Sequence, residues 1–176
     1  MELLSERLLL RPLSQSDMNF LVRLEQNPLN QKYERDTIPS EDEIIGKYNA
    51  YLKTDTVGAK AKYYFIVKDQ KGQNSIGKIT LKVRRKDINE WEMGWAISPE
   101  YWGKGYAIEA ARRVADFAFH ELNARRIVAH CHADHRQSEA VMIKLGMQKE
   151  GIFRKVLYLH HEWNDQFIYS LFQEEL

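Results

Sequence analysis

Two glycines stand where an apolar strand pattern ends and a long helical pattern begins, within residues 97–110. Gly103 and Gly105 free the backbone at this point, because residues without a Cβ adopt conformations that other residues avoid. The N–H groups at the start of a helix point outward at the positive end of the helix dipole, where they attract anions. A Cβ would keep a diphosphate away from the main chain. The segment therefore predicts a site for a phosphate or diphosphate.

Three phosphate ligands can be compared with this spacing. A Walker loop needs Gly-x-x-x-x-Gly-Lys-Ser/Thr, which the segment does not contain. A dinucleotide fingerprint needs a third glycine where Ile108 stands and an acid at the end of the next strand, but that strand, from Arg125, contains no acid and the first one after it is Asp134. The pyrophosphate of coenzyme A needs only the loop amides. A site for this pyrophosphate therefore remains possible, and so does the simpler interpretation that the helix only happens to begin with glycines.

Cys131 and several histidines are the other residues whose types could do chemistry. A cysteine can carry an acyl group, but a cysteine inside an apolar strand, as here, is usually an inert buried residue. His130 and His132 share a strand face near His135 and could bind zinc. Only the distant His160–His161 pair could complete such a site. We expect neither covalent catalysis nor a bound metal.

The patterns around these residues predict an α+β fold. No internal repeat, linker or low-complexity tract interrupts them, so residues 1–176 are expected to form a single domain. Three consecutive strands should form a meander within a mixed, mostly antiparallel twisted sheet that has helices on both faces. The expected strands cover residues 7–12, 62–68, 75–83, 88–98, 125–132, 148–157 and 162–172.

Turn and capping residues predict where the helices begin and end. Asp17 precedes the first helical pattern, and Ser40 with Glu43 forms a capping box for the second. A long helix follows Gly105, and a short one over residues 138–145 ends at Gly146. Residues 29–39 are expected to be a loop and residues 69–74 a turn.

Composition restricts the class of protein. The 176 residues hold 26 Lys+Arg and 25 Asp+Glu, a formal net charge of +1, so charge marks no surface for nucleic acid or an anionic membrane. No apolar run approaches the ~20 residues of a membrane span, and the start lacks the pattern of a secretory signal. A lone cysteine suits a reducing compartment. We expect a cytoplasmic protein, either monomer or homodimer, without nucleic-acid or membrane partners.

Residues 92–110, Glu-Met-Gly-Trp-Ala-Ile-Ser-Pro-Glu-Tyr-Trp-Gly-Lys-Gly-Tyr-Ala-Ile-Glu-Ala, resemble the acetyl-CoA motif of the GNAT N-acetyltransferases. Three further blocks, residues 5–17, 138–151 and 162–171, resemble the branch that contains the ribosomal-protein-alanine N-acetyltransferases. These blocks match its first strand and helix, its late helix and following strand, and its closing strand. The similarity covers nearly the whole chain.

The resemblance implies a sheet splayed at its centre, with the pantetheine of acetyl-CoA in the gap and its pyrophosphate on the loop amides. The family motif Gln/Arg-x-x-Gly-x-Gly/Ala matches Gly105 and Ala107, while Trp102 replaces its first residue. His135 stands where an Asn-x-x-Ser segment usually has asparagine. The coenzyme-binding residues implied are Ile97, Ser98, Trp102, Gly103, Lys104, Gly105, Tyr106, Ala107, His135 and Ser138.

Acetyl transfer requires a neutral amine, support for an oxyanion and a proton for the leaving thiolate. Glu92 is the expected base, with Glu90 on the same strand face as its reserve and as an acceptor contact; either could instead be an exposed strand carboxylate. Ser138 is the expected sulfur contact or proton donor, or simply a helix cap. Met142 stands where other members have a tyrosine acid. Tyr33 is expected to face the acceptor.

The leading hypothesis is an acetyl-CoA-dependent N-acetyltransferase that acts on a primary amine by direct attack in a ternary complex. The resemblance favours a protein N-terminal α-amine, which titrates near pH 8, whereas a lysine amine titrates near 10.4. One alternative is a small amine acceptor, such as a polyamine, an amino acid or a drug. Another is a non-catalytic acyl-CoA sensor. The missing third glycine disfavours a nucleotide-dependent oxidoreductase.

Overall fold

The computed structural model describes residues 1–54, 61–71 and 74–176. Its centre is an eight-stranded sheet in the order β1-β2-β3-β4-β5-β6-β8-β7, in which only the β5–β6 pair is parallel among the described pairs. The predicted α+β class and mostly antiparallel sheet are confirmed. The strands are β1 (Leu3–Leu4), β2 (Leu8–Pro12), β3 (Lys62–Asp69), β4 (Ser75–Arg85), β5 (Glu90–Ile97), β6 (Arg126–His132), β7 (Gln148–Leu159) and β8 (Glu162–Leu171).

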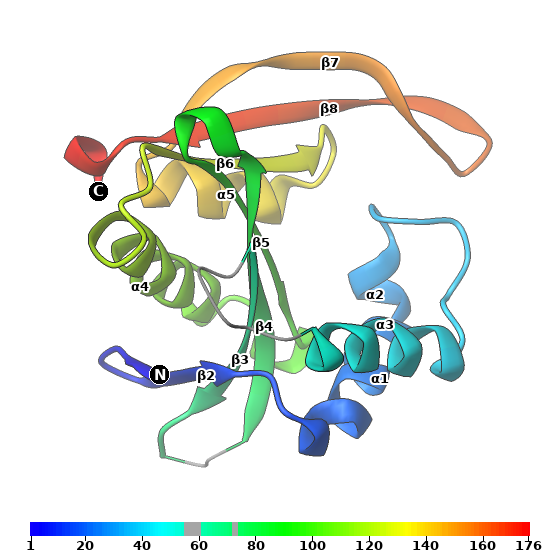
Figure 1. Cartoon of the computed structure of the whole chain (residues 1–176). Coiled ribbons are helices and arrows are strands. Elements are labelled where there is room, and N and C mark those ends of the chain that lie inside the picture. The colour runs from blue at the N-terminus through cyan, green and yellow to red at the C-terminus, as the bar shows by residue number, and fades with distance from the viewer. Residues whose placement is uncertain (55–60, 72–73) are drawn as a thin grey trace.

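Helices cover both faces of this sheet (Figure 1). The larger apolar core lies between the sheet and one pair of helices, α4 (Tyr106–His120) and α5 (Arg136–Leu145). A smaller core joins β3 to α1 (Met18–Gln26) and α3 (Glu41–Lys53), with the short α2 (Pro28–Gln31) between them in the chain. None of the helices that the structure describes is long and apolar enough to cross a membrane.

Residues at the helix ends do what the sequence predicts for them. Ser40 Oγ accepts the N–H of Glu43 (3.2 Å), and the Glu43 carboxylate accepts the N–H of Ser40 (2.7 Å), so the capping box that begins α3 is confirmed. Gly146 ends α5 with φ +96°, in the left-handed region. These local features fix where α3 begins and where α5 ends.

Two elements differ from the expectation. Residues 29–39 begin inside α2, because Asn27 accepts the N–H of Leu29 (3.0 Å) and Pro28 occupies the first helical position, where no N–H is needed. The last helix begins at Arg136, so Ser138 lies inside its first turn and the helix-cap interpretation of Ser138 is wrong. In the turn expected at 69–74, residues 72–73 lie outside the described part of the chain.

The sheet opens between its two central strands. Parallel pairing of β5 with β6 covers Glu90 to Glu92 and then stops, although β5 continues to Ile97. β6 likewise continues beyond its last paired residue, to His132. In the described sheet, the β5 backbone groups that point toward β6 after Glu92 have no strand partner, so they can bind amide groups of another molecule. The splay that the resemblance implied is confirmed.

Candidate functional site

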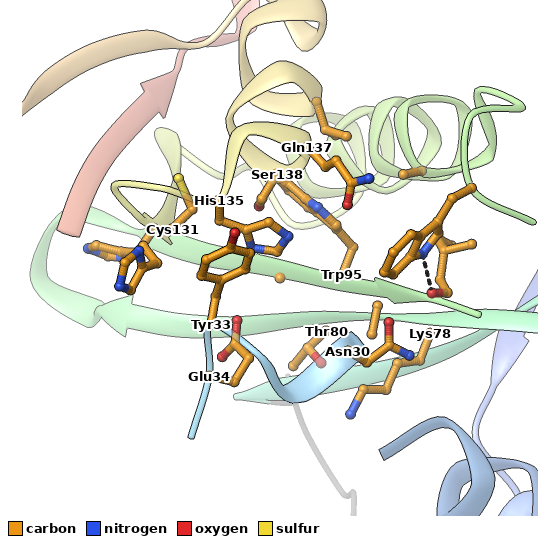
Figure 2. Close-up of a pocket in the computed structure, with 18 of the residues that line it drawn as sticks. Asn30, Tyr33, Glu34, Lys78, Thr80, Trp95, Cys131, His135, Gln137 and Ser138 are labelled. Atoms are coloured by element: carbon orange, nitrogen blue, oxygen red, sulfur yellow. Dashed lines mark hydrogen bonds between the residues drawn. The ribbon is translucent and has the colours of Figure 1, made fainter. Parts of the chain in front are cut away.

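A cavity of about 640 Å³ lies where β5 and β6 separate. Residues of β4 and β5 form its floor, α5 and the loop before α4 close one side, and α1, α3 and the segment after α2 close the other (Figure 2). Most of the predicted site residues line it: Tyr33, Glu92, Ile97, Trp102, Gly103, Gly105, Tyr106, Ala107, His135 and Ser138. The fold thus brings together residues that are more than 100 positions apart.

Three predicted residues lie outside this lining. Glu90 is 2% exposed, and its carboxylate is bound by Arg84 (2.6 Å) and Arg126 (2.9 Å) where β5 begins. Both arginines form ion pairs with this carboxylate, which does not line the cavity, so the structure does not support Glu90 as an acceptor contact. The N–H of Ser98 donates to a β4 carbonyl (2.8 Å), and the Lys104 ammonium lies 5.2 Å from an aromatic ring centre beside the loop.

The glycine loop adopts the backbone conformation that its residue types suggested. Gly103 has φ +75° and Gly105 has φ +80°, both left-handed, and Gly105 is the N-cap of α4. The N–H of Glu109 makes a helical bond to Gly105 O (3.1 Å). The N–H groups before Glu109, on residues 106–108, belong to the first turn, which has no helical acceptors. These amides face the cavity end where an anion would bind.

Arg7, which the sequence did not single out, holds this loop in place. Its Nε binds the Glu109 carboxylate (2.7 Å), its Nη1 donates to the Lys104 carbonyl (3.0 Å), and its guanidinium lies 4.7 Å from the Tyr106 ring centre. Burial raises the pKa of Glu109, but hydrogen bonds from the Arg7 backbone, Ser5 and the guanidinium outweigh it and leave that pKa lowered. An ionised Glu109 therefore fixes the start of α4 to the chain before β2.

Trp102 has a structural role that explains a tryptophan at this position. Its indole N–H donates to the carbonyl of Ile97 (2.7 Å). This bond closes the segment between the end of β5 and the glycine loop, which includes a 3-10 turn over Pro99–Tyr101. The Trp102 side chain thus positions the loop from within, and the backbone amides stay available.

Two candidate reacting groups lie on the cavity surface. Glu92 is 27% exposed and its Oε1 lies 3.0 Å from Nζ of Lys82, its neighbour on β4. Ser138 lies on the inner side of α5 next to Gln137, across the cavity from Tyr33 (Figure 2). Burial lowers the pKa of His130, which favours its neutral imidazole. A carboxylate, a hydroxyl and an imidazole therefore line the cavity, with Glu92 at the point where β5 and β6 begin to separate.

Cys131 and Met142 do not offer alternatives to these groups. Cys131 lines the cavity but is 5% exposed, and burial raises the pKa of its thiol to about 11. A thiol with that pKa is a poor nucleophile at neutral pH. Met142 is fully buried in the core between α5 and the sheet.

Aromatic contacts join the segment after α2 to the coenzyme side of the cavity. The Tyr33 ring stacks on His135 at 4.6 Å between ring centres and lies 5.1 Å from His132. The same segment is held from its other side by His160, whose N–H donates to Asp36 (2.6 Å). Three of the histidines considered as zinc ligands, His132, His135 and His160, thus make other contacts. Within residues 1–54, 61–71 and 74–176, no group of three or more His, Cys, Asp or Glu is arranged to hold a metal ion.

An ionic cluster that sequence reasoning missed lines the side opposite α5. Glu25 of α1 accepts bonds from Lys47 (2.5 and 2.7 Å), from Lys78 of β4 and from the Tyr48 hydroxyl. Burial raises the pKa of Glu25, but the two ammonium groups and the phenol outweigh it and lower that pKa to about 2. Burial lowers the pKa of Lys78 to about 8 despite Glu25. Glu34 lines the same side of the cavity.

Comparison with known proteins agrees with this geometry. The family model "Acetyltransferase (GNAT) domain" matches residues 7–148. The chain belongs to this family. As a GNAT protein it is an N-acetyltransferase, and the family uses acetyl-CoA as the acetyl donor. The predicted superfamily and enzyme class are confirmed.

Several relatives of this GNAT protein span its whole length. The uncharacterized N-acetyltransferase YnaD of Bacillus subtilis is 29% identical over 175 residues, covering 99% of each chain. A GNAT acetyltransferase from Bacillus anthracis is 30% identical with a TM-score of 0.85, covering 99% of this chain and 100% of its own.

Two more distant structures share the fold and differ in acceptor. Vibrio cholerae spermidine N-acetyltransferase, crystallised with CoA and spermine, is 24% identical with a TM-score of 0.85, covering 97% and 98% of the two chains. The ribosomal-protein-S5-alanine acetyltransferase of Vibrio fischeri is 21% identical with a TM-score of 0.83, covering 99% and 98%. The GNAT fold thus carries both kinds of acceptor, and the acceptor must be argued from the site.

Proposed function

We propose that this protein transfers the acetyl group of acetyl-CoA to a protein N-terminal α-amine, by direct attack in a ternary complex. The observation that carries the proposal is the position of the glycine loop. Left-handed Gly103 and Gly105, the first-turn amides of α4 and the open edge of β5 all face one cavity. The loop amides would hold the pyrophosphate, and the β5 backbone would hold the pantetheine amides.

The reacting groups would act where β5 and β6 begin to separate. Acetyl-CoA supplies an activated thioester. Glu92, directly or through one water, takes the proton that the amine loses, and the amine nitrogen forms its bond to the acetyl carbon as the carbon–sulfur bond breaks. Ser138 donates its hydroxyl proton to the leaving thiolate and regains one from water, or directs a proton from water to the thiolate. Cys131, as a buried neutral thiol, takes no part.

The ordinary pKa of the amine favours an α-amine as the acceptor. The Glu92 carboxylate, the proposed base, lies 3.0 Å from Nζ of Lys82. An α-amine titrates near pH 8, so an appreciable fraction is neutral at pH 7 to 8, whereas an alkyl amine near 10.4 needs far more help. The resemblance to the ribosomal-protein-alanine branch, in residues 5–17, 138–151 and 162–171, points to the same acceptor.

A second candidate function is acetylation of a small amine. The fold shared with Vibrio cholerae spermidine N-acetyltransferase favours it. The two functions differ in a direct experiment, in which acetyl-CoA consumption is followed by thiol release with N-terminal peptides, polyamines and amino acids as acceptors. Efficient turnover of small amines with unreactive peptides would overturn the protein-directed proposal. Coenzyme binding without transfer to any amine would indicate a sensor, and no CoA binding by calorimetry would overturn the proposal entirely.

The roles of Glu92 and Ser138 can be tested by substitution. Glu92→Gln should lower kcat by about 100-fold, with the KM for acetyl-CoA little changed, because it removes a base and leaves the coenzyme cradle intact. Ser138→Ala should lower kcat for acetyl-CoA less, since water can protonate a thiolate. Glu100→Gln is the matched control, because Glu100 is exposed and outside the cavity lining. An unchanged kcat in Glu92→Gln would remove Glu92 from the mechanism.

A further inference from the structure

We infer that the Lys47–Glu25–Lys78 cluster makes this acetyltransferase selective for acceptor peptides with an acidic side chain at the second or third residue, and unfavourable to polyamines. The inference rests on the proposed function, since it assumes a peptide acceptor. It concerns the α1–α3 wall, by which we mean the cavity-lining Glu25, Glu34, Arg35, Lys47 and Lys78.

The cluster carries an excess positive charge that faces the cavity. Two ammonium groups share one carboxylate, so Lys47, Lys78 and Glu25 together have a formal charge of +1. The Glu25 side chain is only 6% exposed, whereas Lys78 is 16% and Lys47 40% exposed. A ligand in the cavity therefore meets ammonium groups, with the carboxylate behind them.

The ammonium groups also have donors left for a ligand. An ammonium has three N–H donors and no acceptor. Nζ of Lys78 uses one for Glu25 and one for the Tyr48 hydroxyl (2.6 Å), which leaves a third. Lys47 Nζ donates only to Glu25 among the described residues. A carboxylate from an acceptor could take both remaining donors without displacing Glu25.

The spacing along the sheet matches a short stretch of extended peptide. Glu92, the proposed base, pairs with Lys82, and Lys78 pairs with Ala96, four residues farther along β5. At about 3.3 Å per residue, the two positions are roughly 13 Å apart. In an extended acceptor whose amine lies at Glu92, the third residue lies roughly 7 Å from the first. An acidic side chain on that residue covers most of the distance that remains to Lys78.

The same charges disfavour a polyamine. Spermidine carries further ammonium groups along an alkyl chain, and one of them would lie against Lys47 and Lys78. Like charges in a partly buried site repel strongly, because the local dielectric is lower than that of water. The α1–α3 wall has two carboxylates among its five residues, and the two lysines already bind Glu25. Glu34 could bind the reacting amine, with Arg35 next to it in the lining, so no other free carboxylate of the wall remains for a further ammonium group.

The selectivity should depend on pH through Lys78. Burial lowers the pKa of this ammonium to about 8, so it is charged below pH 8 and loses its proton as the pH rises through that value. The preference for acidic acceptors should therefore be full near pH 7 and fade by pH 9. The charged or titratable groups that face Lys78 are Glu25 of α1, Lys47 and Tyr48 of α3, and Glu34 and Arg35 after α2.

The test compares matched hexapeptides with Asp, Asn or Lys at the second or third residue, and spermidine. For the unmodified enzyme we expect kcat/KM about tenfold higher for Asp than for Asn peptides, mostly through KM, with Lys peptides and spermidine below Asn. Lys78→Met and Lys47→Met should each abolish most of this ratio, and Lys47→Arg should keep it. Lys53→Met, on the exposed side of the same helix, is the charge-matched control and should keep it too.

Each outcome decides between the two proposals. Equal kcat/KM for Asp and Asn peptides, or a ratio that both methionine variants retain, would overturn the inference while peptide transfer stands. If Lys78→Met fails to fold, Lys47→Met and the pH series still test it. Peptides that do not react at all, with coenzyme binding intact, would overturn the proposed acceptor instead.

Discussion

Replacing Gly105 by alanine tests the coenzyme cradle most directly. Gly105 has φ +80°, which costs a residue with a Cβ about 1–2 kcal/mol. The new Cβ would lie 3.4 Å from Arg7 Nη2 and 4.0 Å from Ile108 Cγ2, which are ordinary contacts, so no clash adds to this cost. At about 2–4 °C per kcal/mol for a chain of this size, the midpoint of thermal unfolding should fall by about 2–8 °C.

The effect on the coenzyme should be larger and confined to its diphosphate. We expect the Kd for acetyl-CoA, measured by calorimetry, to rise at least about tenfold, because an alanine disfavours the left-handed backbone that presents the loop amides to the proposed diphosphate. S-acetyl-N-acetylcysteamine, a thioester without a diphosphate, should react with Gly105→Ala as fast as with the unmodified enzyme. Gly46→Ala is the control: Gly46 lies in the exposed middle of α3 with open space around it, so alanine should stabilise the helix by up to about 1 kcal/mol.

Two results would refute this reasoning. If acetyl-CoA binds Gly105→Ala as tightly as the unmodified protein, the loop amides do not hold the diphosphate. If both donors lose activity to the same extent, the substitution acts on the thioester end of the cavity or on the fold, and the assigned role of the loop is wrong.

Three further substitutions test separate parts of the structure. Glu25→Gln should destabilise the protein by up to about 3 kcal/mol at pH 7, because the ionic contacts of Glu25 hold its pKa in the folded protein at about 2, against an ordinary 4.5. This stability is present above pH 4.5 and is lost as the pH falls toward 2. The urea unfolding curves of the two proteins should therefore converge at low pH. Cys131→Ala should keep kcat within about twofold, since a thiol with a pKa of about 11 is unreactive; loss of all transfer in a folded variant would instead indicate an acyl-enzyme. Trp102→Phe should raise the KM for acetyl-CoA about 3- to 10-fold, because it removes a hydrogen bond to the Ile97 carbonyl worth about 0.5–1.5 kcal/mol; an unchanged KM would show that the bond does not position the loop.

Sequence patterns located the elements well where a local rule governs them. The capping box at Ser40, the helix end at Gly146 and the left-handed glycines before α4 depend on neighbouring residues, so their types suffice. α2 escaped prediction because four residues are too few for a helical period. The helix-cap alternative for Ser138 is wrong because this helix begins two residues earlier, at Arg136, although serine is a good cap in general.

The site residues also divide into those that a local pattern predicts and those that depend on distant contacts. Two glycines before a helix predict the proposed anion-binding amides, and the family motif shows that Trp102 departs from its first position. Its bond to Ile97 depends on the path of residues 98–101, which the motif does not specify. Glu90 and Glu92 share a strand face, and only the arginines that bind Glu90 separate a structural carboxylate from one that lines the cavity.

The amino-acid sequence alone determined that this chain folds as an α+β domain, and that glycines with a left-handed backbone precede its long helix, because periodicity and backbone freedom are properties of adjacent residues. Tertiary structure alone decided which charges meet. Arg7 reaches Glu109 across 102 positions, and Lys78 reaches Glu25 across 53. Such pairs form because the sheet brings separate elements together, and burial of Glu25 and Lys78 makes either charge too costly to leave unpaired.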